Sequence, residues 1–241
     1  MRFLRISSSC IALFMLAACG GGGGGGSPMV PVPVGGGGGG GGGAPPPSLP
    51  SSITTSSGAI IGQDNAFSPT DGDAAAGGNG QTVDGMPCLT TLNENYHIHV
   101  FVGLIQNGHE LALPDGIGMK NPGADSGGVT STASCFYYLH THDASGIVHV
   151  EDPSTASRTT ALHTLGQFFA IWGQPLGAWT TIYTSGQSYR GQGSQFVSNS
   201  TYTKYGGSPG SMPLYAHEVI WLESGSPTLG ATALPGVQFT Y

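Results

Sequence analysis

The sequence predicts one α+β domain dominated by antiparallel β-sheet, and three features of the chain predict it. Two stretches of strand-like residues are each followed by turn residues and a second such stretch, which is typical of β-hairpins. Only one stretch shows the i, i+3, i+4, i+7 apolar spacing of an amphipathic helix. Long glycine and proline runs lie near the N-terminus, so the fold is expected in the remainder of the chain.

Residues 1–18 have the pattern of a signal peptide. Arg2 and Arg5 give a basic start, a short apolar stretch follows, and Leu-Ala-Ala directly precedes Cys19. This resembles the bacterial lipoprotein signal, in which cleavage leaves a lipidated N-terminal Cys19. The apolar stretch is too short to span a bilayer, which takes about 20 residues. An ordinary cleaved signal with a chance cysteine is the alternative.

A disordered glycine-, proline- and serine-rich tether is expected at residues 19–58 because nothing in it can bury apolar surface. Its length gives a root-mean-square reach of roughly 35 Å. Residues 59–86 are expected to be a poorly ordered lead-in, and residues 87–241 the globular, histidine-rich domain. Gly20 after the cysteine favours the outer membrane, so we expect a lipid-anchored protein of the bacterial cell envelope, at the outer membrane or its periplasmic face.

The mature chain is acidic. Without Arg2 and Arg5, four basic side chains remain against 13 acidic ones, a net charge of about −9 with neutral histidines. Such a chain offers no electrostatic footprint for nucleic acid, which is excluded as an expected partner. A cationic ligand suits it better, although an acidic balance also serves solubility.

Two cysteines remain in the expected domain, Cys88 and Cys135. In an oxidising compartment an even pair predicts one disulfide. It would close a loop of about 47 residues, stabilising the fold by roughly 4 kcal/mol in the chain-entropy account, and would remove both thiolates as metal ligands. Two buried free thiols are the alternative.

The first hairpin is expected to pair residues 96–105 with residues 109–113 across the turn Asn107-Gly108. This register sets Ile105 opposite Glu110 and puts His109 on the far face from the other histidines, so His109 is excluded from the site. Alternation gives the strand one face with His97 and His99. The other face carries the residues expected to form the core: Ile98, Val100, Val102 and Leu104.

The second hairpin is expected to pair residues 136–142 with residues 147–151 across Asp-Ala-Ser-Gly. The register sets His140 opposite His149, and His142 opposite Ile147. The three histidines then share one face, and Glu151 continues it.

The single helix is expected to begin after Thr164, which forms a capping box with Gln167. Gly173 and Pro175 end it. Its aromatic stripe is interpreted as core: Leu165, Phe168, Phe169 and Trp172. Further strands are expected at 179–184 and 214–223, a long loop or irregular hairpin at 185–212, and a last edge strand at 237–241.

The two histidine-bearing faces together predict a metal site. Histidines two apart on a strand point to the same side, and neutral imidazoles are good ligands for zinc and copper. The expected ligands are His97, His99, His140, His142 and His149. Glu151 or Asp143 could add a carboxylate or accept a hydrogen bond from a ring N–H. His217 is a further candidate, whereas His163 is expected to have a local role. The plain alternative is that these histidines only make hydrogen bonds on a half-buried sheet.

Other motifs give no catalytic prediction. Residues 206–210 match G-x-S-x-G but lack the strand and helix that position such a serine. The polyglycine runs have no following lysine or helix and so do not predict a phosphate loop.

The phrases HIH, CFYYLHTHDASGIVHVE, TLGQFFAIWGQPLG and AHEVIWLE resemble a family of uncharacterised bacterial extracytoplasmic domains that are often membrane-anchored. The resemblance covers residues 86–223, and its most specific part is HTHDxSGIxHxE. The resemblance implies which proteins this chain groups with and where it is located, more than which chemistry it performs. The H-x-H pairs are also similar, in local geometry only, to zinc sites of alpha-type carbonic anhydrases and copper sites of Cu/Zn superoxide dismutases.

The leading functional hypothesis is therefore a lipid-anchored envelope protein that binds copper or zinc for buffering or delivery. One alternative is a metal-dependent hydrolase in which Glu151 or Asp143 acts as general base on a bound water. The other is an envelope interaction module that holds no metal. An enzyme is not the first expectation, since no catalytic residue is identifiable.

Overall fold

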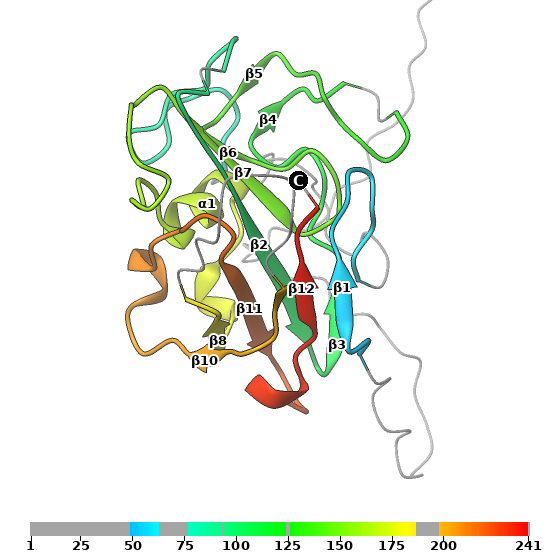
Figure 1. Cartoon of the computed structure of the whole chain (residues 1–241). Coiled ribbons are helices and arrows are strands. Elements are labelled where there is room, and N and C mark those ends of the chain that lie inside the picture. Colours follow the sequence, from blue (N-terminus) through cyan, green and yellow to red (C-terminus); the bar gives the residue numbers. More distant parts are fainter. Residues whose placement is uncertain (1–48, 63–76, 93, 124–125, 187–197, 241) are drawn as a thin grey trace, which may run out of the picture. The chain divides into compact units, whose positions relative to one another are not determined.

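The structure is a computed structural model that describes residues 49–62, 77–92, 94–123, 126–186 and 198–240. The predicted signal peptide, Cys19 and most of the predicted tether lie outside these residues. The described part contains strands, one α-helix and short 3-10 turns (Figure 1), in agreement with the predicted α+β class. No helix in this part is both long and apolar enough to cross a membrane.

The main sheet has seven strands, in the order β10-β8-β11-β2-β7-β6, with β3 also pairing with β2. Strands β2 and β11 run parallel, whereas the other neighbours are antiparallel. The sheet is therefore mixed, and the predicted hairpins account for only part of it. The strands are β2 (Tyr96–Gln106), β3 (His109–Leu111), β6 (Leu139–His140), β7 (Ile147–Asp152), β8 (Thr181–Thr184), β10 (Thr203–Lys204) and β11 (Val219–Ser224).

A three-stranded sheet joins β1 (Ser52–Thr54), β12 (Gly236–Gln238) and β9 (Ser198–Asn199). β1 lies in the range predicted as disordered tether, and β12 is the middle strand rather than the predicted edge. Both corrections have one cause: Ile53 and Val237, on β1 and β12, are buried in a shared apolar cluster. A third, two-stranded sheet joins β4 (Met119–Lys120) and β5 (Cys135–Phe136).

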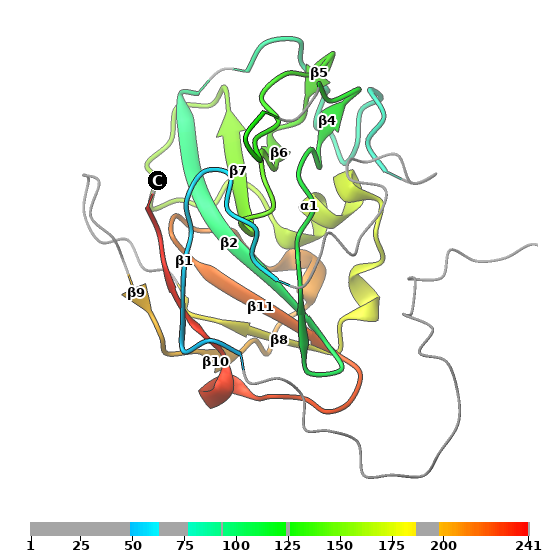
Figure 2. The same ribbon diagram turned by 90° about the vertical axis from the view of Figure 1, so that its right-hand side faces the viewer.

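Strand β2 is buried on both faces, not on one face as predicted. Ile98 and Val100 are buried on one side. On the other side, Phe101 and Ile105 belong to the apolar cluster that also includes Ile53 of β1 and Val237 of β12. Figure 2 shows β1 beside β2. The histidine-bearing face is therefore continuous with apolar core further along the same strand.

The hairpin register follows the sequence pattern. Ile105 pairs with Glu110, with Asn107 and Gly108 both at positive φ in the two-residue turn. His109 pairs with Gln106 and stays near the turn, as predicted.

Helix α1 spans Leu165–Trp172 and has the predicted ends. The Thr164 side chain accepts a hydrogen bond from the backbone N–H of Gln167, whose own side chain caps the Thr164 N–H. Gly173 ends the helix in the left-handed conformation. The predicted aromatic stripe is buried.

The strands after α1 are shorter than predicted. β8 begins only after a 3-10 turn at Leu176–Ala178, and β11 begins only after a turn in which Glu218 N–H donates to the Tyr215 carbonyl (3.1 Å). Residues 187–197 of the predicted long loop lie outside the described residues. Two more 3-10 turns lie at Pro209–Ser211 and Ala231–Ala233.

The predicted lead-in is ordered at its C-terminal end, and residues 63–76 of it lie outside the described part. Gly78 N–H donates to the Ile171 carbonyl (2.7 Å), and Gly80 N–H donates to the Tyr137 hydroxyl (3.0 Å). The first bond ties this stretch to helix α1, and the second ties it to the segment that leads into β6.

Candidate metal centre

Three histidines form one row across three neighbouring strands. His99 on β2 pairs with His149 on β7, and His149 pairs with His140 on β6. Directly opposite residues have Cβ atoms about 4.5–5.5 Å apart, so their side chains meet on one face. The predicted pairing of His140 with His149 is confirmed, and β7 is the strand that joins the two H-x-H pairs.

The next row of the sheet supplies a carboxylate. Glu151 on β7 pairs with His97 on β2. Its Oε1 atom lies 3.4 Å from His97 Nε2, 3.6 Å from His149 Nδ1 and 3.7 Å from His140 Nε2. A single buried oxygen therefore faces three imidazoles.

His142 reaches the cluster from a loop. The predicted strand 136–142 is broken into β5 and β6 and ends at His140, because the chain then bonds to other loops. Thr141 N–H donates to the Ile117 carbonyl (3.0 Å), and Thr130 N–H donates to the His142 carbonyl (2.7 Å). His142 is therefore not paired with Ile147 as predicted, because the pairing of β6 with β7 ends at His140 and His149. Even so, its Nε2 atom lies 3.2 Å from that of His140.

Backbone carbonyls fix the tautomers of these two rings. His140 Nδ1 is 3.0 Å from the Tyr137 carbonyl, and His142 Nδ1 is 2.8 Å from the Thr130 carbonyl. A carbonyl oxygen only accepts, so each Nδ1 carries a hydrogen and each neutral ring has its lone pair on Nε2. The two lone pairs face each other at 3.2 Å, an arrangement that a shared cation stabilises. Metal-binding histidines in proteins are commonly oriented by such carbonyl bonds.

Burial keeps the central imidazoles neutral. Desolvation, followed by repulsion from neighbouring imidazoles, lowers the pKa of His99 to about 2. The same causes lower the pKa of His149 to about 3. Burial also lowers the pKa of His140 to about 3, with His149 acting in the same direction and Glu151 opposing it. At neutral pH these rings are in the form that binds metals.

The spacing of the donor atoms suits a transition metal. Two groups of side chains each bring one ligand atom per residue within 4.8 Å of one another. They are His140, His142, His149 and Glu151, and His97, His99 and His149. With metal–nitrogen bonds of about 2.0–2.1 Å, two ligands of a tetrahedral ion lie about 3.3 Å apart. The separations of 3.2 to 3.7 Å in the cluster are close to that value.

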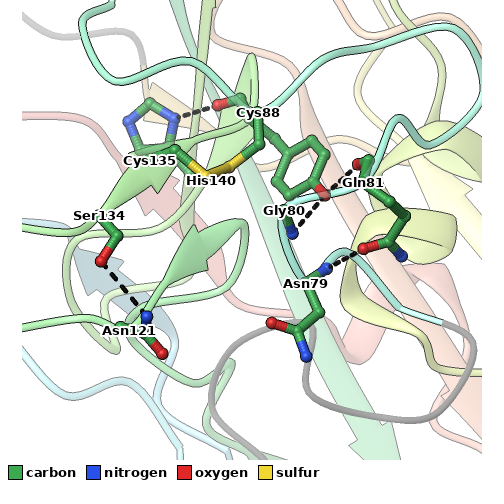
Figure 3. The surroundings of a disulfide bond; sticks show 9 residues. Asn79, Gly80, Gln81, Cys88, Asn121, Ser134, Cys135 and His140 are labelled. Atoms are coloured by element: carbon green, nitrogen blue, oxygen red, sulfur yellow. Dashed lines mark hydrogen bonds between the residues drawn. A yellow bond between two sulfur atoms is a disulfide. The ribbon is translucent and has the colours of Figure 1, made fainter.

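A disulfide lies beside the cluster. Cys88 and Cys135 are bonded, as predicted, with their Cα atoms 5.4 Å apart. Figure 3 shows the disulfide next to His140, whose ring bonds to the carbonyl of Tyr137. The Tyr137 hydroxyl in turn donates to the Gln81 carbonyl. The segment that orients His140 is thus held by one covalent link and by residues 77–86.

Two further candidates lie outside both ligand groups. Asp143 accepts hydrogen bonds from Gly58 N–H (2.8 Å), from Ser145 N–H (3.1 Å) and from the Ser145 hydroxyl, so its carboxylate serves the turn. His217 has a positive φ and donates its backbone N–H to the His99 carbonyl (2.8 Å). Its ring packs on Phe239, with ring centroids 5.2 Å apart.

His163 has a local role, as predicted: its Nε2 atom lies 2.8 Å from Asp152 Oδ2. The sequence interpretation missed Glu94, whose Oε2 atom lies 3.4 Å from His97 Nδ1. Its position three residues before His97 was the available signal. The carbonyls of Thr130 and Tyr137 had no sequence signal, because any residue type supplies a carbonyl.

Comparisons with protein-family models, with curated proteins and with solved structures give no match to this chain.

Proposed function

We propose that this chain is a lipid-anchored protein of the bacterial cell envelope that binds copper or zinc through its histidine cluster, for metal buffering or delivery. The observation that carries the proposal is the pair His140 and His142. Their Nε2 atoms lie 3.2 Å apart, and both Nδ1 atoms are engaged by backbone carbonyls. Two preoriented imidazoles with Glu151 beside them form a binding site for a cation.

The donor chemistry supports copper or zinc. Imidazole nitrogens with one carboxylate oxygen suit these ions, whereas calcium and magnesium are usually held by oxygen ligands. The disulfide consumes the two cysteines of the domain, so thiolate binding does not compete.

The proposed location rests on the sequence. The lipoprotein-like signal before Cys19, the glycine-rich tether and a disulfide, which persists in oxidising compartments, all support an envelope protein.

Calorimetric titration of the mature protein with Zn²⁺ and Cu²⁺ tests the proposal. We expect stoichiometric binding whose tight step is lost in the double variant His140→Ala, His142→Ala. The control is His109→Ala, which removes a histidine on β3 that belongs to neither ligand group and should bind as the unchanged protein does. Absence of binding of both metals would refute the metal function and favour the interaction module.

A second candidate is a metal-dependent hydrolase. The group His97, His99 and His149 offers three imidazoles, and three protein ligands with an open fourth position are typical of catalytic zinc. Glu151 is the acid near this group, because Asp143 is engaged by its turn. Zinc-dependent cleavage of a p-nitrophenyl ester that disappears in His97→Ala would favour the hydrolase, and the absence of cleavage by zinc-loaded protein would count against it.

A further inference from the structure

The cluster contains more ligands than one ion uses. Five histidines and Glu151 lie in two overlapping ligand groups, and a tetrahedral zinc ion takes four ligands. Both groups include His149, which stands in the middle of the row between His99 and His140.

Each end of the cluster has its own close pair of donors. At one end, the Nε2 atoms of His140 and His142 are 3.2 Å apart. At the other end, His97 Nε2 and His149 Nδ1 are 3.4 Å apart. Both separations match one edge of a tetrahedral metal site, about 3.3 Å. Glu151 Oε1 lies near both pairs, 3.7 Å from His140 Nε2 and 3.4 Å from His97 Nε2.

The two ends differ in their access to solvent. The His140 side chain is 0% exposed, whereas that of His97 is 26% exposed. Beyond His97 stands Glu94, which is 63% exposed and lies 3.4 Å from His97 Nδ1. Donor atoms thus run from the surface through His97 and Glu151 to the fully buried His140, whose neighbour His142 is half-buried.

We propose that the cluster holds two metal ions in unequal positions. The inner ion is bound by His140, His142 and Glu151. The outer ion is bound by His97, His99 and His149, at the end that opens toward Glu94. The inference rests on the proposed metal function and extends it, because the outer position lies on the route by which an ion enters or leaves the inner one.

Charge makes the two positions unequal in affinity. Glu151 is the single carboxylate in the two ligand groups, and the imidazoles are neutral when they bind. One divalent ion leaves a net charge of about +1, whereas two leave about +3 within a few ångströms, where repulsion is strong. The second ion is therefore bound more weakly, as expected for a position that loads or releases metal.

Calorimetric titration of the mature chain with Zn²⁺ tests this inference. We expect two equivalents, the second at least tenfold weaker. The variant His97→Gln, His99→Gln should keep one tight equivalent, and His140→Gln, His142→Gln should lose the tight step. Glutamine retains the size and polarity of the site, and far-ultraviolet circular dichroism checks the fold of each variant.

Copper(II) gives an independent readout. Two neighbouring Cu²⁺ ions couple magnetically, so the paramagnetic resonance intensity should rise with the first equivalent and stop rising in proportion with the second. A single equivalent that either double variant abolishes would overturn the two-ion inference and leave the proposed function standing. A wild-type protein that binds no metal would overturn both.

Discussion

Glu151 stands directly across the β2–β7 pair from His97, with its Oε1 atom 3.4 Å from the His97 Nε2 atom. This pairing brings a buried carboxylate to both ends of the imidazole cluster. It also gives the cluster negative charge where a cation would bind.

Replacing Glu151 with Gln should weaken metal binding by about ten- to a hundredfold, because a neutral amide no longer balances the charge of the ion. The affinity for Zn²⁺, measured by competition with a chromophoric chelator, checks this. The matched control is Glu110→Gln, which neutralises a buried carboxyl on β3 outside both ligand groups. Equal affinities in the two variants would contradict the role given to Glu151.

The metal-free protein should lose stability as the pH falls below about 6.5. Burial lowers the pKa of His99 to about 2 and those of His140 and His149 to about 3, and it also lowers the pKa of His217. The unfolded chain, with imidazole pKa values near 6.5, therefore binds more protons than the folded one. The free energy of unfolding is therefore undiminished above about pH 6.5. Below that pH it falls by about 1.4 kcal/mol per pH unit for each such imidazole.

Two carboxyls act in the opposite direction. Burial raises the pKa of Glu110 to about 7 and also raises that of Glu218, so these groups favour folding as the pH falls. The four imidazoles outweigh the two carboxyls, so the net effect of lowering the pH is a loss of stability. Urea unfolding at pH 7.5, 6.0 and 5.0 checks this, and His140→Gln should flatten the dependence. A free energy of unfolding that is equal at pH 7.5 and 5.0 would show that the imidazoles are not neutral in the fold.

Gly118→Ala should destabilise the protein by about 1–3 kcal/mol, the cost typical of a strained backbone position. Gly118 has φ +74°, and a Cβ atom there would lie 2.2 Å from the Leu139 carbonyl oxygen and 3.1 Å from His140 Cβ. Metal affinity should fall as well, because β6 must shift. Thermal unfolding and zinc titration measure the two effects.

The control for this substitution is Gly177→Ala. A Cβ at Gly177 meets nothing within 4 Å, and no positive φ is present there. Stability should change little. A Gly118 variant that behaves like the Gly177 variant would mean that the β6 segment tolerates displacement.

The double substitution Cys88→Ser, Cys135→Ser should cost about 4 kcal/mol of stability, because the disulfide closes a loop with a sequence separation of 47. Urea unfolding of the variant, and of the unchanged protein after reduction, should give similar losses. Weaker zinc binding is expected too, since Cys135 lies two residues before the carbonyl that orients His140. Undiminished zinc affinity would show that the residues 77–86 contacts hold Tyr137 without the covalent link.

Local pattern predicted much of the fold. The Asn107-Gly108 turn set the register of Ile105 with Glu110, and the Thr164 capping box located the start of α1. Such features depend on neighbours only a few residues away, so alternation, turn residues and caps are sufficient to predict them.

Long-range pairing was less predictable. β1 runs parallel to β12 at the other end of the chain, and His142 leaves its strand to bond with Thr130. Neither feature is marked by a repeating pattern in the sequence. Each depends on which distant backbone groups need hydrogen-bond partners once the core has formed.

The sequence by itself determined that His97 and His99 share a strand face, that His140 stands opposite His149, and that Glu151 has the same parity as His149. Only the tertiary structure decided that β7 lies between β2 and β6, so that His99, His149 and His140 form one row. The reason is physical: side-chain direction follows from the two-residue repeat of a strand, whereas the neighbour of each strand is chosen by burial and hydrogen bonding across the whole domain.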